Sequence, residues 1–518
     1  MTEDPAPSPT ASQLPVPPTP AVPLSEAVGI LVFVGVFLAV LMGSMDALVV
    51  STVLPRIASN LHQVNGVTFV VSAYLISSTI SIPIFARLSD ILSRRNVFLL
   101  GLATFIVGSA LAGLSQNLDE LILFRGVQGF GGGGVFPVAI AMVAILYPPE
   151  TRARVTGLLT GAAGIAIVAG PLVGSYIVSV TTWRWVFYIN LPFGVLAMVV
   201  LLAAVGPLRP TNRGRFDGPG AALLTGWVGA LMLALVQVAD AGWTWTDPRI
   251  VALLVGATVG LGLFLYWELR TREPLVPLRL LRQRVIGASS GAMFFTGIVF
   301  SAMLTFLSVF VGIVLLHNGP NATNDVRDII YFLAIPLILG AVASGQILNR
   351  VSYRAVVAPG LAMAAVASFF LANLTTSTPL WTFQFGFVLS GGIALPLIPI
   401  GFGLGFSLTG TTIAVQNEAP AAEVGAAIGL GRFFQSLGGA LGISLLTVFL
   451  TWRDTTLSAG VTSASGLASA LVTSYDEVFL ALAVSVAIAF GFSLALRGRV
   501  PVASAASKSE SEAAPPPE

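Results

Sequence analysis

The sequence predicts an all-α polytopic membrane protein, on three observations. Hydrophobic residues make up 55% of its 518 residues, charged residues only 9%, and the mean hydropathy is +0.91. A soluble domain carries about 25% charged residues. Charge-poor runs long enough to span a bilayer, about 20 residues, recur along the chain. Short alternating segments separated by turn residues are scarce, which favours helices over a β-barrel.

We expect fourteen spanning helices between two disordered tails. The tail of residues 1–24 is proline-rich and has no Lys or Arg, so it lacks the basic start of a signal peptide, and we expect the first helix to be retained. Residues 500–518 form the second tail. The expected helices are residues 28–54, 66–86, 96–115, 119–147, 154–180, 186–206, 218–239, 250–268, 286–316, 328–348, 355–374, 390–416, 425–451 and 477–496.

The basic residues of the expected loops predict the orientation. Eighteen of the 25 Lys and Arg residues fall on the side that carries both termini, five fall on the other side, and Arg125 and Arg432 fall inside helices. Short loops rich in Lys and Arg stay in the cytoplasm. We therefore expect a multi-pass protein of the cell (plasma or inner) membrane with both termini in the cytoplasm.

The first helix contains one isolated acid, in residues 40–56 (VLMGSMDALVVSTVLPR). Asp46 is the only charged residue between Glu26 and Arg56. An ionised carboxylate at the centre of a bilayer helix costs about 2.5–3.5 kcal/mol on insertion scales, so such a residue is a functional candidate by default. We interpret Asp46 as the residue that couples the protein to protons.

Two loops repeat along the chain. Residues 86–95 (ARLSDILSRR) align with residues 345–354 (GQILNRVSYR), each after the second helix of a six-helix set, and residues 147–157 and 417–427 correspond after the fourth. Parallel six-helix halves of this kind are a known transporter plan. The expected units are a tail at 1–24, an N-terminal six-helix bundle at 25–208, two extra helices at 209–273, a C-terminal six-helix bundle at 274–499 and a tail at 500–518.

The fourth helix carries a buried charge of opposite sign, in residues 123–134 (LFRGVQGFGGGG). From the helical rise, Arg125 lies roughly 9 Å and Asp46 roughly 12 Å from the outer ends of their helices. Two opposite charges at similar depth could pair, which would offset the desolvation of each. Separation of the pair on protonation of Asp46 would make a proton switch. A purely structural pair is the alternative.

The fifth helix contains residues 164–174 (GIAIVAGPLVG). Pro171 removes a backbone donor and bends the helix, while Gly164, Gly170 and Gly174 allow close packing. These features predict a helix that can rock against its neighbours, although Gly and Pro are common in membrane helices.

Besides Asp46 we count no acid placed within the membrane in the C-terminal half, so we expect an apolar substrate site that is not built to neutralise several cations. Arg432 lies seven residues into the thirteenth predicted helix. It either snorkels to the cytoplasmic interface or contacts a substrate or an acid. The candidate residues of the substrate cavity are Met45, Gln128, Phe294, Gln416, Arg432 and Phe433.

The loop after the second helix resembles the G-x-L-x-D-R-x-G-R-R pattern of the major facilitator superfamily. It keeps Asp90, Arg94 and Arg95 and has Ala86 and Ser93 in place of the usual glycines. These charges could pair with one another and with neighbouring helix ends, and so hold the cytoplasmic face closed. The alternative is that they only set the topology.

Other segments carry the same resemblance. Residues 45–55 (MDALVVSTVLP) are similar to the first-helix motif L-D-x-T-I-V-N-V-A-L-P of fourteen-helix drug:proton antiporters, and residues 164–174 are similar to the antiporter motif of exporters. Residues 183–192 and 416–420 resemble recurrent segments of the same group. Over about residues 28–496 the resemblance implies the major facilitator fold, with two pseudo-symmetric halves and two extra central helices.

We therefore expect a proton-coupled antiporter that exports hydrophobic small molecules and drugs, a multidrug efflux protein of the kind that confers antibiotic resistance. Export of lipids or glycolipids by the same fold and nutrient:proton symport are alternatives. The chain has no Cys, and its two histidines, His62 and His317, fall near predicted loops, so nothing indicates an enzyme or a metal site. We expect a monomer in contact with membrane lipid and a small hydrophobic substrate, with no nucleic acid and no cofactor besides the proton gradient.

Overall fold

The computed structural model describes residues 25–61, 67, 69–206, 214–240, 243–311, 322–372 and 392–498. Within these ranges, fourteen helical segments are long and apolar enough to cross a membrane, which confirms the predicted number of spans. The two predicted tails and both histidines lie outside the described residues.

The spans form two groups of six with one pair between them. The first group is α1 (Glu26–Leu61), α2 (Phe69–Ile91), α3 (Arg94–Leu114), α4 (Leu118–Leu146), α5 (Pro149–Val180) and a broken span made of α6 (Trp185–Tyr188) and α7 (Asn190–Ala204). The pair is α8 (Gly218–Asp240) and α9 (Pro248–Arg270), followed by the short 3-10 helix η2 (Leu278–Arg282). The second group is α10 (Arg284–Val309), α11 (Ala322–Ile347), α12 (Tyr353–Leu371), α13 (Ala394–Glu418), α14 (Val424–Ser458), preceded by η4 (Ala421–Glu423), and α15 (Ala464–Ser493).

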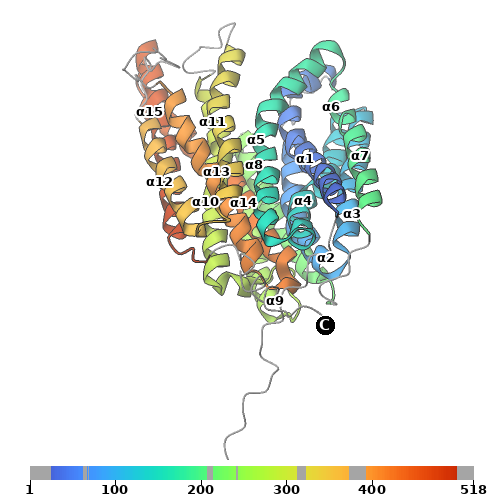
Figure 1. Ribbon diagram of the computed structural model, residues 1–518. Coiled ribbons are helices and arrows are strands. Elements are labelled where there is room, and N and C mark those ends of the chain that lie inside the picture. The colour runs from blue at the N-terminus through green and yellow to red at the C-terminus, as the bar shows by residue number, and fades with distance from the viewer. Residues whose placement is uncertain are drawn as a thin grey trace, which may run out of the picture.

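The two groups repeat the same packing. In the first half α1 packs on α5 and α2 on α4, and in the second half α10 packs on α14 and α11 on α13. The halves meet along two equivalent pairs, α2 with α14 and α5 with α11. Figure 1 shows them side by side, the first half in blue to green and the second in yellow to red. The structure thus has the two-fold repeat that the loops predicted.

Both described ends of the chain lie at one end of the bundle, which we call the termini end; the opposite end is the far end. Gly29, in the first turn of α1, accepts a hydrogen bond from the Tyr147 hydroxyl, just after α4. Gly498 accepts one from the backbone N–H of Tyr353, where α12 begins. In Figure 1 the termini end points down, where the red ribbon of α15 ends.

Several helix ends differ from the prediction by five or more residues. The first helix continues to Leu61 instead of ending near residue 54, and the last begins at Ala464 instead of near residue 477. Glu477 of α15 pairs with Arg453 of α14, so the residues around position 477 form a helical contact instead of a loop.

The glycines of α4 bring three helices together backbone to backbone. A Cβ added to Gly131 would lie 2.3 Å from the backbone nitrogen of Phe105 in α3, and one added to Gly133 would lie 2.1 Å from the carbonyl oxygen of Ser78 in α2. Real side chains cannot approach a backbone atom this closely. The helix that carries Arg125 is therefore held between α2 and α3 at a fixed distance, as small residues allow in membrane bundles.

This packing predicts the effect of one added methyl group. Gly131→Ala should lower the free energy of unfolding by about 1–3 kcal/mol, because α3 and α4 must separate. Gly126→Ala is the matched control: it lies in the same helix, nothing lies within 4 Å of its added Cβ, and it should leave stability unchanged or raise it by up to about 1 kcal/mol. Thermal unfolding in detergent measures both. Equal midpoints for the two variants would contradict the close packing.

Candidate functional site

Asp46 and Arg125 meet inside the first half. A terminal guanidinium nitrogen of Arg125, on α4, donates to Oδ2 of Asp46, on α1, and neither side chain is exposed to solvent. Each charge therefore compensates the other where water cannot. The helical rise predicted this contact from the sequence, although α1 is longer than expected.

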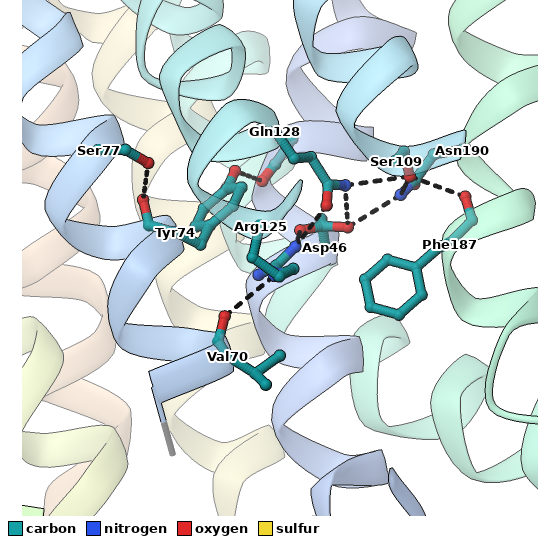
Figure 2. A network of polar contacts seen from close by, with 10 residues as sticks. Asp46, Val70, Tyr74, Ser77, Ser109, Arg125, Gln128, Phe187 and Asn190 are labelled. Atoms are coloured by element: carbon teal, nitrogen blue, oxygen red, sulfur yellow. Dashed lines mark hydrogen bonds and ion pairs between the residues drawn. The ribbon is translucent and has the colours of Figure 1, made fainter. Parts of the chain in front are cut away.

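Two amides complete the surroundings of the carboxylate, as Figure 2 shows. Oδ1 of Asp46 accepts from Nε2 of Gln128 at 2.8 Å and from Nδ2 of Asn190 at 2.9 Å. Both amides also donate to the hydroxyl of Ser109, at 3.1 and 3.0 Å. All three partners of Asp46 are donors, and an ionised carboxylate can only accept. The geometry is therefore built for the charged form of Asp46.

Arg125 has further contacts on the side of α2. Its Nε donates to the carbonyl oxygen of Val70 at 3.2 Å, and its guanidinium carbon lies 4.3 Å from the centroid of the Tyr74 ring. The Tyr74 hydroxyl in turn donates to the carbonyl oxygen of Gly43 at 3.2 Å. Among the described residues Nη2 of Arg125 has no hydrogen-bond partner. The cation–π contact partly compensates this buried donor.

Three members of this network were not singled out from the sequence: Tyr74, Ser109 and Asn190. Asn190 is the first residue of α7, at the break after α6. It lies within residues 183–192, a segment that resembled the family but to which no functional role was assigned. Pro192 in the first turn of α7 lacks only an N–H that a helix start leaves free. A buried Asn in an apolar span was the available signal.

A cavity of about 170 Å³ reaches the carboxylate. Apolar side chains of α1, α5, α6 and α7 line it, Met45 among them, and Asp46 and Asn190 are its only polar lining residues. The cavity therefore offers space beside Asp46 without a competing charge.

A second site of buried charge closes the termini end. Residues 86–91, which were predicted to begin a loop, continue α2, and Asp90 is fully buried. Its Oδ1 accepts from the backbone N–H of Gly425 at 2.9 Å and its Oδ2 from that of Ala426 at 2.7 Å. These are unpaired donors of the first turn of α14, where the helix dipole favours an anion. An acid of the first half thus caps a helix of the second.

The two arginines of this motif have different partners. Arg94 donates to Oδ1 of Asp90 at 3.0 Å and so completes the compensation of that acid. Arg95 instead donates to the carbonyl oxygen of Val205, at the end of α7, at 2.5 Å. Arg94 therefore belongs to the closure between the halves, and Arg95 ties α3 to α7 within the first half.

The closure continues across the termini end between α13 and the first half. Nε2 of Gln416 donates to the carbonyl oxygen of Ile140 at 3.0 Å, and its Oε1 accepts from the hydroxyl of Thr156 at 3.3 Å. Arg152 donates to Oδ1 of Asn417 at 3.2 Å. Gln416, a candidate cavity residue, thus lies in the closure between the halves.

The glycines of residues 164–174 place α5 between the acid-bearing helix and the second half. A Cβ added to Gly164 would lie 2.4 Å from Cγ1 of Ile338 in α11, and one added to Gly170 would lie 2.9 Å from Cβ of Leu48 in α1. Pro171 lies inside the helix and Gly174 is buried one turn further on. Helix α5 therefore contacts both α1 and α11 closely.

The remaining cavity candidates do not gather at one place. Gln128 belongs to the Asp46 network, and Phe433 is buried against Trp227 of α8. Phe294 packs on Phe295 and Phe434. Arg432 lines a separate cavity at the boundary of the two halves.

Comparison with known proteins gives the following similarities. A family model described as Major Facilitator Superfamily matches residues 32–443. The chain is 30% identical over 425 residues to the multidrug transporter protein MdtP of Bacillus subtilis, covering 82% of this chain and 76% of that one. It is 28% identical to multidrug resistance protein 3 of Bacillus subtilis, covering 87% and 86%, and 28% identical to the tetracenomycin C resistance and export protein of Streptomyces glaucescens, covering 81% and 75%.

Solved structures share the fold at low identity. The human organic anion transporter MFSD10 superposes with a TM-score of 0.57 at 16% identity, covering 90% of this chain and all of that one (100%). The proton:xylose symporter XylE superposes with a TM-score of 0.58 at 12% identity, covering 89% and 95%. These likenesses establish the architecture alone.

The contacts of Asp90 predict how the closure responds to loss of charge. Asp90→Asn should loosen the termini end, because hydrogen bonds to a charged group contribute about 1.5–3 kcal/mol. The chain has no cysteine, so Ser89→Cys gives a single buried thiol at the contact of α2 with Gly425. In nanodiscs, maleimide labelling of this thiol should become about tenfold faster in the Asp90→Asn background, the equivalent of about 1.4 kcal/mol.

The matched control for that experiment is Asp119→Asn, which removes an exposed acid at the far end, in the first turn of α4. It should leave the labelling rate unchanged. A rate for Asp90→Asn within twofold of the parent would mean that Asp90 does not hold the halves together.

Proposed function

This chain belongs to the Major Facilitator Superfamily, a family of membrane transporters and not of enzymes, and from that premise we propose that it is a proton-coupled antiporter that exports hydrophobic small molecules, drugs among them. Its similarity to export proteins supports export, and the site itself supports the proton as the driving ion. The observation that carries the proposal is the buried pair of Asp46 and Arg125.

The pair supports proton coupling because the ion pair between Asp46 and Arg125 exists only while the Asp46 carboxylate is charged. A proton on Asp46 removes the negative charge that compensates Arg125 and turns an acceptor oxygen into a donor. The contacts with Gln128 and Asn190, both donors, then lose one acceptor position. Protonation therefore changes the packing among α1, α4 and α7, whereas a neutral residue at position 46 could not respond to pH.

We place the termini end in the cytoplasm, because most Lys and Arg residues of the predicted loops lie on that side. The described contacts of Asp90 and Gln416 then close the cytoplasmic side. Shifting such a two-state equilibrium from 1:99 to 99:1 takes about 5.5 kcal/mol. Two or three hydrogen bonds to a buried charge, at about 1.5–3 kcal/mol each, are of that size. These contacts therefore contribute enough free energy to favour the state that is closed to the cytoplasm, and little enough for the protein to leave it.

Helix α5 connects the Asp46 site with the contact between the two halves. At Gly170 it contacts Leu48 of α1, two residues after Asp46, and at Gly164 it contacts α11 of the second half. A change around Asp46 is thus passed to the boundary of the halves through one helix. Rocking of the halves about this boundary would expose the transported molecule on alternate sides.

The cargo follows from the relatives and from the cavity. Relatives at 28–30% identity are named for multidrug transport and for export of tetracenomycin C. We propose that this chain exports small apolar molecules of that general kind. Lipid export is the second candidate, because the cavity beside Asp46 is almost wholly apolar.

The test is Asp46→Asn in everted membrane vesicles that carry a pH gradient. With tetracenomycin C or the apolar dye N-phenyl-1-naphthylamine as cargo, the wild type should transport and also discharge the gradient. The variant should lose at least about nine-tenths of both activities, because it cannot bind the coupling proton. Asp119→Asn, at an exposed position, is the control and should transport normally.

Full gradient-driven transport by a folded Asp46→Asn protein would refute the proton role. Transport of labelled phospholipid in proteoliposomes, together with failure to move either small molecule, would replace drug export with lipid export. An unchanged melting temperature establishes that the variant is folded, so loss of transport then reports on coupling.

A further inference from the structure

A second cavity, of about 150 Å³, lies where the halves meet. Residues of α1, α2 and α4 form most of its lining, and Arg432 of α14 is its one lining residue from the second half. An apolar cavity of this volume is large enough to hold a benzene ring. The cavity therefore has room for a ring-sized group next to a cation.

Arg432 has no acidic partner among the described residues. Its Nη1 donates to Oε1 of Gln435 at 2.5 Å, and its guanidinium carbon lies 3.8 Å from the centroid of the Phe136 ring. A guanidinium has five N–H donors, so most remain for another partner. Asp46, two residues along α1 from the lining residue Ser44, is already paired with Arg125.

The contacts of Arg432 decide against snorkelling. The residue lies eight positions after the start of α14 at Val424, roughly 12 Å along the helix. Its guanidinium packs on a ring of α4 in the opposite half and lines the cavity between them. An arginine inside a span costs about 2.5–3.5 kcal/mol on insertion scales, which marks an inward-facing one as functional.

The rest of the lining suits a ring with one acceptor group. The hydroxyl-bearing residues Tyr74, Ser44 and Ser78 supply polar atoms, while Val40 and Ile82 supply apolar surface. Among the described residues that line this cavity, none is acidic. A cationic ligand would therefore meet an uncompensated positive charge, whereas an anionic one would meet its natural partner.

We propose that this cavity binds an organic anion, its charged group at Arg432 and its apolar ring against the lining of α1 and α2. The inference rests on the proposed export function and adds to it the charge of the substrate. Carboxylates and sulfonates match the planar fork of a guanidinium, which can donate two parallel hydrogen bonds.

A ligand in this cavity would touch the proton site through one side chain. The Tyr74 ring lies against the guanidinium of Arg125, and Tyr74 also lines the cavity. A Cβ added to Gly132, another lining residue, would lie 2.6 Å from the Tyr74 hydroxyl. Tyr74 therefore contacts both the cavity and the partner of Asp46.

The test compares radiolabelled benzenesulfonate with its neutral analogue benzenesulfonamide, by equilibrium dialysis against the full chain in nanodiscs. Wild-type protein should bind the sulfonate more tightly than the sulfonamide. Arg432→Gln should weaken sulfonate binding at least about tenfold and leave sulfonamide binding within about twofold. Arg432→Lys should fall between the two, because it keeps the charge and loses the fork.

Arg453→Gln is the matched control, since it removes the same charge from the same helix at a residue paired with Glu477. It should change neither affinity. The proposal is overturned if wild-type protein does not prefer the sulfonate, or if Arg432→Gln binds it as tightly as wild type does. An equal loss in Arg453→Gln would also overturn it, since the effect would then be one of net charge. The wild-type preference decides the matter even if a variant does not fold.

This binding measurement needs no pH gradient, so it fails separately from the proposed function. Normal gradient-driven transport by Asp46→Asn would refute proton coupling and leave the anion site standing. Equal sulfonate binding in wild type and Arg432→Gln would refute the anion site and leave proton-coupled export standing.

Discussion

The compensation of one buried carboxylate organises the first half of this transporter. Asp46 cannot remain ionised in an apolar helix without donors around it, and its three donors come from two other helices, α4 and α7. Arg125 and Gln128 lie one turn apart on α4, and Asn190 opens α7 at a break in the sixth span. The same contact therefore fixes how α1, α4 and α7 pack and makes that packing sensitive to a proton.

The sequence predicted those parts of the site that follow from regular geometry. The pair of Asp46 and Arg125 was predicted from depths counted at 1.5 Å per residue, although the end assumed for the first helix was seven residues short. Gln128 was named only as a candidate of the substrate cavity, although residues three apart share a helix face. Tyr74 and Asn190 could not be assigned a role, because neutral residues are common in spans and their contacts cross between helices. Asp90 was misplaced in a loop because the helix start that it caps belongs to the other half.

The two halves close the termini end by different means, although their helices repeat. At the contact of α2 with α14, the anionic Asp90 accepts from the first turn of α14. At the equivalent contact of α11 with α5, the aligned residue is the neutral Asn349, and close packing takes over: a Cβ added to Gly345 would lie 2.4 Å from the carbonyl oxygen of Ala153. Both contacts are closely packed at glycines, since a Cβ added to Gly429 of α14 would lie 2.2 Å from Cβ of Ala86, but only the first also depends on a charge. Opening is therefore expected to begin at α2 and α14.

The charge of the cargo changes the energetics of exchange. Each elementary charge that crosses the membrane contributes about 2.3 kcal/mol per 100 mV, so an interior-negative potential drives an organic anion outward as well as a proton inward. Local electrostatics act in the opposite sense, because a proton on Asp46 leaves Arg125 uncompensated and would attract an anion at Arg432. Exchange of a proton for an anion then requires that protonation of Asp46 and anion binding at Arg432 disfavour each other through a change in side-chain packing. Tyr74, which contacts Arg125 on one side and lines the anion cavity on the other, is the residue placed to do this.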